Sequence, residues 1–265
     1  MRCSVVTPNY NGAAFLERTI TSVLAQAGPE VELEYIVVDG GSSDGSLAII
    51  DRYADGITQR IVEPDSGPAN AINKGLRLAS GDIISWLGAD DVYFPGTLAR
   101  VVAAAQHSPR AGMWFGRCPI IDGEDQEIRQ GITHFKECFF PFSARFTFQC
   151  INYLSQPALF FSRPALDRAL PLREDMVAAW DYDFLLRIWQ SGPAQFVPGP
   201  PLAAFRWHQS SISGRHFHTQ FREELEAVRR ESGSWSPQSL IHSLVRWGIV
   251  GAYSLMAAQR RARLG

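Results

Sequence analysis

Short apolar runs alternate with amphipathic stretches over about the first hundred residues of this 265-residue chain. The apolar runs are typical of buried parallel strands and predict strands at 3–7, 34–38, 58–62 and 82–87. Stretches with apolar residues at helical spacing predict helices at 13–26, 45–54, 68–79 and 95–106. Repeated β–α units of this length indicate a mainly parallel central sheet with helices on both faces. The pattern therefore predicts a three-layer α/β fold.

The alternation changes after about residue 110. Further strands are predicted at 113–116, 118–121, 158–161 and 202–206, with a turn at Asp122–Gly123 leading into 126–132, and a helix is predicted at 182–190. We expect this half to extend the same sheet and to form one wall of a site. Residues 133–155 are rich in aromatic side chains, which are better explained as core than as a surface that stacks on a ligand.

A break at 231–237 precedes a predicted C-terminal helical tail at 238–263. The uncharged run at 247–259 is shorter than the roughly 20 apolar residues that a membrane span needs. Two alternatives remain for this tail. It packs back on the domain or on a second subunit, as in a homodimer, or it lies on the anionic surface of the inner membrane, with Trp247 and Tyr253 at headgroup level.

Composition excludes some classes of protein. The net charge of −2 offers no electrostatic case for a nucleic-acid partner. Four cysteines without paired spacing indicate thiols in a reducing compartment: Cys3, Cys118, Cys138 and Cys150. The first predicted strand begins at residue 3 and leaves no room for a signal peptide, so we expect a cytoplasmic protein, with a peripheral place on the inner membrane if the tail binds lipid.

Two adjacent carboxylates follow the strand at 82–87. In open α/β sheets ligands collect at the carboxyl ends of the strands, which is where Asp90 and Asp91 are expected. Two carboxylates side by side repel each other unless a proton or a cation lies between them, and Mg²⁺ and Mn²⁺ favour such oxygen ligands. The alternative is that Asp90 caps the following turn and Asp91 is solvated.

The loops after the first two strands are also polar. In Thr7–Gly12, Pro8 fixes the exit from the strand and leaves Tyr10 free to offer a ring face. After the second strand, Asp39 is placed to accept a hydrogen bond from a base or a ribose. The Gly-rich dinucleotide fingerprint is absent from the first of these loops, which disfavours an NAD enzyme.

In combination, these segments resemble family 2 glycosyltransferases, which have the GT-A fold and transfer sugars from nucleotide-sugar donors. The segments that carry the resemblance are Thr7–Asn11, Val37–Ser46, Ala69–Gly75, Asp82–Gly96 and Trp180–Asp183. Their order and spacing cover residues 1 to about 210. They are specific for the family but give almost no indication of which sugar is transferred.

The resemblance implies a role for each matching residue. On the donor side it implies a nucleotide site formed by Thr7, Pro8, Tyr10, Asp39 and Lys74, with Asp91 as a ribose partner or an outer neighbour of the metal. Asp90 matches the last acid of the family's D-x-D metal motif, whereas the first acid falls on Gly88, which is a departure. The implied cofactor is a divalent cation, Mn²⁺ or Mg²⁺.

The resemblance also implies catalytic chemistry. It places the general base at Asp181; the alternative is that Asp181 is a helix N-cap. His208 lies in a loop that resembles the one folding over the donor diphosphate, where it would complete the metal shell or contact phosphate, although a surface histidine is the commoner explanation. His216 and His218 are weaker candidates for such a role.

These features predict an inverting, metal-dependent hexosyl- or N-acetylhexosaminyltransferase. A UDP-sugar is favoured as donor, and a glycan or lipid-linked acceptor of polysaccharide or cell-envelope biosynthesis is expected. The predicted organisation is a donor half at 1–110, an acceptor and base half at 111–230 and a helical segment at 231–265. A catalytically inactive nucleotide-sugar binder is the main alternative. A nucleotidyltransferase is disfavoured because Thr7–Gly12 lacks Lys and Arg, and a carboxylate-pair hydrolase would leave the nucleotide-like loops without a purpose.

Overall fold

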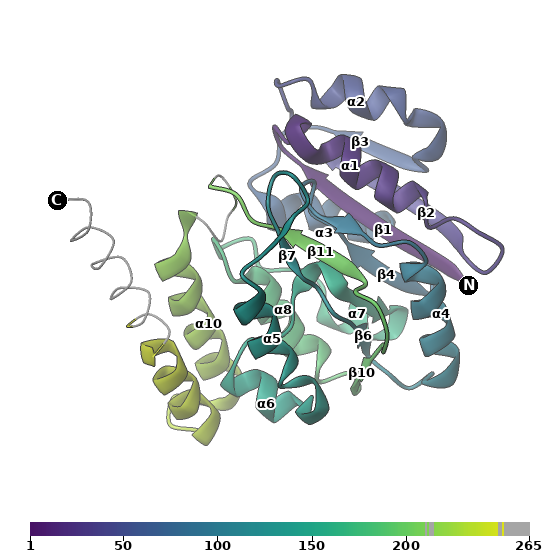
Figure 1. The fold of residues 1–265 in the computed structure, drawn as a ribbon. Helices are drawn as coiled ribbons and strands as arrows, with labels where there is room; N and C mark the ends of the chain where they lie inside the picture. Colours follow the sequence, from purple (N-terminus) through teal and green to yellow (C-terminus); the bar gives the residue numbers. More distant parts are fainter. Residues whose placement is uncertain (210, 212–214, 249–250, 252–265) are drawn as a thin grey trace.

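A mostly parallel sheet forms the centre of the protein. The computed structural model describes residues 1–209, 211, 215–248 and 251. Within this part, seven strands pair in the order β10-β6-β9-β4-β1-β2-β3, and only the pairs made by β9 are antiparallel (Figure 1). The strands are β1 (Arg2–Asn9), β2 (Glu32–Asp39), β3 (Gln59–Val62), β4 (Ile83–Trp86), β6 (Met113–Phe115), β9 (Leu159–Ser162) and β10 (Ala194–Phe196).

Helices cover both faces of this sheet. They are α1 (Ala13–Leu24), α2 (Ser46–Arg52), α3 (Pro68–Leu78), α4 (Thr97–His107), α5 (Gln130–Glu137), α6 (Arg145–Cys150), α7 (Arg163–Ala169), α8 (Trp180–Ile188) and α10 (Phe217–Ser232). Short 3₁₀ turns lie at Ala54–Gly56, Phe140–Phe142 and Gln156–Ala158. The predicted three-layer α/β arrangement is confirmed.

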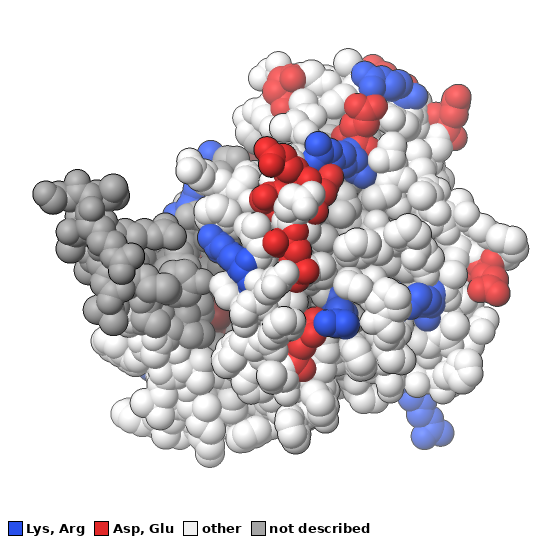
Figure 2. Space-filling view, viewed as in Figure 1, with Lys and Arg blue, Asp and Glu red and all other residues white. Residues whose placement is uncertain are grey.

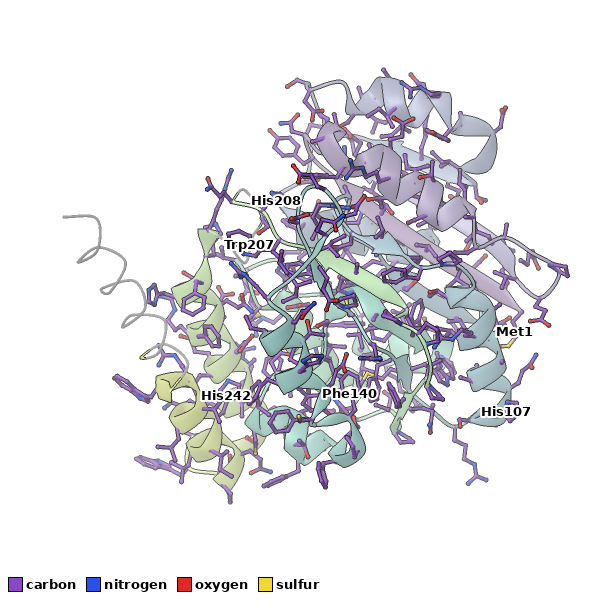
Figure 3. All side chains as sticks on the ribbon, in the orientation of Figure 1. Met1, His107, Phe140, Trp207, His208 and His242 are labelled. Atoms are coloured by element: carbon purple, nitrogen blue, oxygen red, sulfur yellow. The ribbon has the colours of Figure 1, made fainter. Side chains whose placement is uncertain are left out.

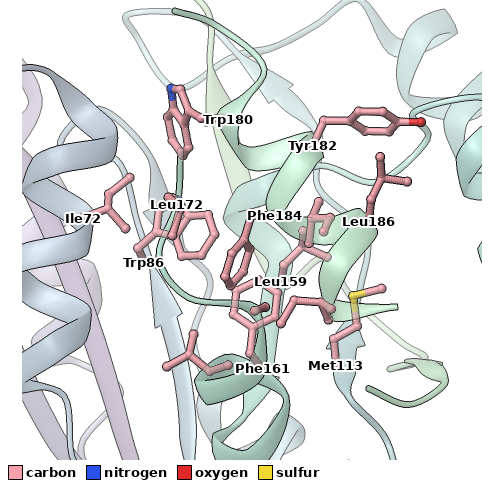
Figure 4. Packing of buried hydrophobic residues seen from close by; sticks show 14 of the residues in the cluster. Ile72, Trp86, Met113, Leu159, Phe161, Leu172, Trp180, Tyr182, Phe184 and Leu186 are labelled. Atoms are coloured by element: carbon pink, nitrogen blue, oxygen red, sulfur yellow. The ribbon is translucent and has the colours of Figure 1, made fainter. Parts of the chain in front are cut away.

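Side chains that alternate along the strands build two cores. In β1, Val5 packs with α1 and α4 on one face, whereas Val6 packs with α3 and α8 on the other. The second core is rich in aromatic rings, and Figure 4 shows Trp86, Phe161 and Phe184 gathered in it. Trp86 ends β4 and lies 5.3 Å from Phe161 and 5.4 Å from Phe184, measured between ring centroids. The strand that leads to the predicted metal site is thus rigidly held.

A second, smaller sheet corrects one prediction. Its strands pair in the order β5-β11-β7-β8 and are β5 (Val92–Tyr93), β11 (Ala203–Arg206), β7 (Ile120–Ile121) and β8 (Glu127–Ile128). The expectation that 118–121 and 202–206 extend the central sheet was therefore wrong, because β7 and β11 pair in this second sheet. The strand predicted at 126–132 is also shorter, because Arg129 adopts a positive φ of 54° that ends β8 before α5 begins.

The region at 133–155 contains most of α5, a 3₁₀ turn and α6, none of which the local pattern predicts. Its aromatic residues are divided between core and surface. Phe148 is fully buried, whereas Phe142 and Phe146 are exposed. The expectation that these aromatics form core is confirmed for Phe148 and wrong for Phe142 and Phe146.

The C-terminal tail packs back on the domain as far as the structure describes it. Residues 237–248 are helical, and the buried His242 ring lies 3.0 Å from the carbonyl oxygen of Gln149 in α6. Most of the remaining predicted helix, at 249–250 and 252–263, lies outside the described residues. Within the described residues, none of the helices combines the length and apolar character needed to cross a membrane.

Candidate functional site

The loops after β1, β2 and β4 meet at one edge of the sheet. Asn9 pairs with Asp39 in the parallel register of β1 and β2, and Val6 pairs with Trp86 in that of β1 and β4. Parallel strands place their carboxyl ends together, so the polar residues that follow these strands converge there. This edge is where the predicted nucleotide and metal residues lie.

Asp39 holds the first two loops together. One carboxylate oxygen accepts the backbone N–H groups of Gly41 and Ser42 at 3.0 and 2.7 Å. The other accepts the Asn9 side-chain amide at 2.6 Å and the Ser42 hydroxyl at 2.8 Å. Asp39 is fully buried, and these bonds use the four lone-pair sites of a carboxylate. A base edge would therefore have to displace one of these partners, and the role of Asp39 toward a base stays a prediction.

The other residues predicted for the nucleotide pocket divide into buried and exposed ones. Thr7 is buried beneath the edge, where its hydroxyl is 3.1 Å from the Tyr35 hydroxyl. Pro8, next in β1, is partly exposed. Tyr10 is 67% exposed, and its ring lies against Gly40, beside the Asp65 carboxylate. The structure thus brings Tyr10, but not the Thr7 side chain, to the surface of the site.

Asp65 was not among the predicted site residues. It lies in the loop that follows β3, at the same edge of the sheet, and its carboxylate accepts the backbone N–H of Gly67 at 2.9 Å. An acid after the next parallel strand is a signal that could have identified it. Lys74 of α3 does not point freely into this edge, because its ammonium group contacts Glu63 at 2.8 Å and the Pro64 carbonyl oxygen at 2.9 Å.

Asp90 and His208 come together from distant parts of the chain. The Asp90 Oδ2 atom lies 2.9 Å from His208 Nε2, and both side chains are partly exposed, at 32% and 24%. His208 follows β11, packs its ring 5.2 Å from that of Phe15, and is drawn beside Trp207 in Figure 3. Two neighbouring ligands of an octahedral ion with bonds of about 2.0–2.1 Å are separated by about 2.9 Å. The two atoms are hydrogen-bonded to each other, and a Mg²⁺ or Mn²⁺ ion held by both would replace that hydrogen bond at nearly the same separation.

The described residues do not form a complete metal cage. No group of three His, Cys, Asp or Glu side chains converges within the described part of the chain. Mg²⁺ is commonly held by one or two protein ligands, with substrate phosphates and water completing the shell. Asp90 and His208 are consistent with that open arrangement, in which the donor diphosphate would supply further ligands.

Asp91 and the buried Arg206 support this pair. Asp91 Oδ1 accepts the backbone N–H of Arg206 at 2.8 Å. Burial, and then the neighbouring Asp90 carboxylate, raise the pKa of Asp91 well above its usual range. The Arg206 guanidinium donates to the Asp90 carbonyl oxygen at 2.7 Å and pairs with Asp125 at 2.5 Å. Sequence reasoning missed Arg206, whose buried position nothing in the local pattern indicates.

The surface around this arginine is acidic. Figure 2 shows a band of acidic side chains on the front face, over the hairpin between β7 and β8. The turn of this hairpin carries Asp122, Glu124 and Asp125. Arg206 donates to the Asp122 carbonyl oxygen at 2.5 Å and so ties the hairpin to the Asp90 loop.

The Asp90 and Asp91 carboxylates lie close to Gly88, the position that departs from the D-x-D pattern. A Cβ atom at this position would lie 2.8 Å from Asp90 Oδ1 and 3.0 Å from Asp91 Oδ2. The bare glycine thus lets both carboxylates fold back over the backbone. Carboxylate oxygens of Asp90 and Asp91 occupy the space that a side chain at position 88 would need.

Asp181 lies in the first turn of α8. The N-cap position is Ala179, so the alternative that Asp181 itself is the N-cap was wrong. Its Oδ1 atom accepts the backbone N–H of Tyr182 at 2.8 Å. The preceding Trp180 packs its ring 6.2 Å from that of Trp86, which connects the start of α8 to the end of β4 (Figure 4).

Two further charged groups surround Asp181. Burial raises the pKa of Asp181 to about 6, while the Lys136 ammonium group of α5 opposes that rise. Burial also lowers the pKa of Lys136, which donates to the Ser155 hydroxyl at 3.2 Å. Burial raises the pKa of Glu224 in α10 to about 7. A carboxylate with a pKa near neutrality is well matched to accept a proton. Sequence reasoning missed Lys136 and Glu224.

Asp183, two residues after Asp181, has a different environment. Its carboxylate contacts Arg230 at 2.7 Å and Arg187 at 3.0 Å and is 9% exposed. The contact with Arg230 joins α8 to α10, and the contact with Arg187 lies within α8. Asp183 is therefore part of the packing of the domain.

Comparison with known proteins identifies the family of the chain. Residues 4–170 match the family described as glycosyl transferase family 2. The match covers more than half of the chain, and the chain belongs to glycosyl transferase family 2. It is therefore a member of an enzyme family that transfers glycosyl groups.

Three curated relatives differ in how much of their length is matched. An uncharacterized glycosyltransferase of Nostoc sp. is 37% identical over 136 residues, covering 50% of this chain and 41% of the relative. The PGL/p-HBAD biosynthesis glycosyltransferase of Mycobacterium bovis is 38% identical over 111 residues, covering 40% and 43%. This chain thus spans less than half of either protein. An uncharacterized glycosyltransferase of Mycobacterium tuberculosis is 32% identical over 187 residues, covering 69% and 67%.

Solved structures agree on the fold. S. aureus TarS 1-349 in complex with UDP-GlcNAc has a TM-score of 0.67 at 18% identity, covering 86% of this chain and 67% of that one. The mannosyltransferase PcManGT from Pyrobaculum calidifontis, in complex with GDP-Man and Mn²⁺, has a TM-score of 0.63 at 20% identity, covering 100% and 81%. The predicted GT-A fold is confirmed.

Proposed function

We propose that this chain is an inverting, metal-dependent glycosyltransferase that uses a nucleoside-diphosphate sugar, with a UDP-hexose or UDP-N-acetylhexosamine favoured. The acceptor is a hydroxyl of a glycan or lipid-linked molecule of cell-envelope polysaccharide biosynthesis. The observation that carries the proposal is the Asp90–His208 pair at 2.9 Å, linked through Trp86 and Trp180 to a carboxylate whose pKa is about 6. TarS was solved with UDP-GlcNAc and PcManGT with GDP-Man and Mn²⁺, which supports the class of donor.

In this mechanism Asp181 accepts the proton of the acceptor hydroxyl. The hydroxyl oxygen then bonds to the anomeric carbon of the sugar, while the bond from that carbon to the donor diphosphate breaks. A single displacement from the opposite face inverts the anomeric centre. Asp90 and His208 would hold the divalent cation, which supplies charge neutralisation for the departing diphosphate. Tyr10 offers an exposed ring face to the nucleobase of the donor.

Binding of nucleotides tests the donor site directly. Isothermal calorimetry with UDP, GDP, dTDP and CMP, each with and without Mn²⁺, should give metal-dependent binding of one nucleotide, with UDP expected. That result would narrow the sugar to the set carried by that nucleotide. If a well-folded protein bound none of the four, the donor site would be wrongly assigned.

The transfer rate should depend on pH through Asp181. The base must be a carboxylate to accept a proton, and its pKa is about 6. We therefore expect kcat/KM to fall below pH 6 and to rise to a plateau above it. Lys136 holds the pKa of Asp181 down, so K136M should move this acidic limb to higher pH. Rates measured from pH 4.5 to 8 would show both effects.

The matched control for this prediction is K136R, which keeps the positive charge. It should leave the midpoint of the acidic limb near that of the wild type. An acidic limb that stays in place in K136M, or one that moves equally in both variants, would contradict the assignment of this limb to Asp181.

We further propose that an apolar surface near the C-terminus places the protein on the cytoplasmic face of the inner membrane. In the helical stretch at 237–248, Leu240, Leu244 and Trp247 lie at helical spacing on one face, and Leu244 and Trp247 are 72% and 71% exposed. His242, on another face, packs toward α6, as Figure 3 shows. Three arginines at Arg260–Arg263 follow in sequence and would favour anionic lipid.

A vesicle experiment tests this proposal. The full chain should sediment with vesicles containing phosphatidylglycerol and less with pure phosphatidylcholine, and L244D should weaken that binding several-fold. L78D, which changes an exposed leucine of α3, serves as the control and should bind as the wild type does. Equal sedimentation of L244D would contradict the proposal. A concentration-dependent dimer that L244D breaks would favour a second subunit on this surface.

A further inference from the structure

Glu223 of α10 reaches across to the segment just before α8. One of its carboxylate oxygens accepts the backbone N–H of Val177 at 2.9 Å. The other accepts those of Ala178 and Ala179 at 2.9 and 3.0 Å. Glu223 is 7% exposed. Three hydrogen bonds from backbone N–H groups to one buried carboxylate are stronger than neutral ones and fix the position of the segment.

These bonds fix the chain at its entry to α8, because the N–H groups belong to the N-cap residue and the two residues before it. The N-cap residue of α8, Ala179, has no side chain that accepts a hydrogen bond. The free N–H groups at a helix start attract negative charge, which Glu223 provides from another helix. Asp181 follows Ala179 by two residues, so its carboxylate moves with the anchored turn.

The other end of the same segment is also anchored. Asn73 of α3 donates to the Leu172 carbonyl oxygen at 2.9 Å and accepts the Leu172 backbone N–H at 2.8 Å. Asn73 and Asn70 both donate to the Glu174 carboxylate, at 2.8 and 2.9 Å. The segment between α7 and α8 is therefore held by α3 at its start and by α10 at its end.

We propose that Glu223 is a positioning residue for Asp181 and that its anchor on Val177–Ala179 sets the reach of the base toward the acceptor hydroxyl. This inference rests on the proposed function, in which Asp181 is the base. A displacement of about 1 Å in a reacting group can cost about 100-fold in rate. We therefore expect E223Q to lower kcat about 10- to 100-fold, because the amide puts an N–H donor against the backbone donors that the carboxylate accepts.

A double-mutant cycle with D181N tests the inference. If Glu223 acts through Asp181, E223Q should lower kcat in the wild-type background and change little in the D181N background. Calorimetry should give the same nucleotide Kd for wild type and E223Q within about two-fold, since the donor site is not touched. A role limited to general stability would instead lower the melting temperature and lower the rate equally in both backgrounds, which would overturn the inference.

Two other variants make the result decisive. E226Q makes the same chemical change on the same helix at an exposed residue and should leave kcat unchanged. E223D keeps the charge on a shorter side chain and should keep more activity than E223Q; it carries the test if E223Q does not fold. Near-normal transfer by D181N alone would refute the proposed base. Equal kcat values for E223Q, E223D and wild type would refute only the positioning role.

Discussion

Replacing Asp181 with asparagine should lower the rate of sugar transfer by about 10²–10⁴-fold, which is the usual contribution of a general base. An amide of the same shape cannot accept the proton of the acceptor hydroxyl. The measurement is kcat from initial rates, together with the nucleotide Kd from calorimetry. The Kd should not change, because the loss lies in the chemical step.

Although D181N should lower the transfer rate, it should not lower the stability of the protein. Burial raises the folded-state pKa of Asp181 from 3.8 to about 6, so at pH 7.5 its charge is less favourable in the folded protein than in the unfolded chain. A neutral asparagine removes this cost, and the melting temperature at pH 7.5 should stay the same or rise. Functional carboxylates commonly oppose stability in this way.

D183N, two residues away, is the contrasting control. Its carboxylate is buried between Arg187 and Arg230, and removing that charge leaves both arginines without it. D183N should therefore lower the melting temperature while D181N does not. A D181N variant with near-normal transfer would contradict the assignment of the base, and one with a lower melting temperature would contradict the expected gain in stability.

The fold of about the first hundred residues could be predicted because its signals are local. The apolar runs of β1, β2 and β4 can each be recognised from their own sequence, without knowledge of the strands they pair with. The loops that follow them carry the polar residues of the site. The helix α10 at Phe217–Ser232 was not predicted, nor were α5 and α6. These helices pack on elements that are far away in the sequence. Neither the hydrophobic periodicity nor the helix propensity of each segment is therefore enough to predict them.

The same distinction applies to the site. Asp90 and Asp181 stand in recognisable segments, whereas their supporting partners do not. Arg206 reaches Asp90 across 116 positions, and Glu223 reaches Val177 across 46. No local pattern encodes such pairs. The buried hydroxyl of Thr7 shows the reverse problem, since a residue in the right segment can still face the core.

Gly88 was the reason to consider a catalytically inactive nucleotide-sugar binder. The Asp90 and Asp91 carboxylates both lie close to Gly88, so this position still has two acids beside it. Nucleotide binding without turnover across many acceptors would nevertheless favour the inactive binder. Rates with a panel of acceptors therefore separate the two functions.

Replacing Asp90 with alanine should abolish the metal-dependent part of nucleotide binding and lower transfer by at least about 100-fold. Neutralisation of the leaving group by a metal is worth several kcal/mol, and the variant would keep only His208 of the proposed pair. Calorimetry with UDP, with and without Mn²⁺, measures the first effect, and initial rates measure the second. Uridine, which has no diphosphate, is the matched control ligand and should bind both proteins alike. Unchanged Mn²⁺ dependence in D90A would show that the cation is held elsewhere. Loss of uridine binding would show that Asp90 instead supports the base pocket, because its carbonyl oxygen and side chain connect Arg206 and His208 to the end of β4.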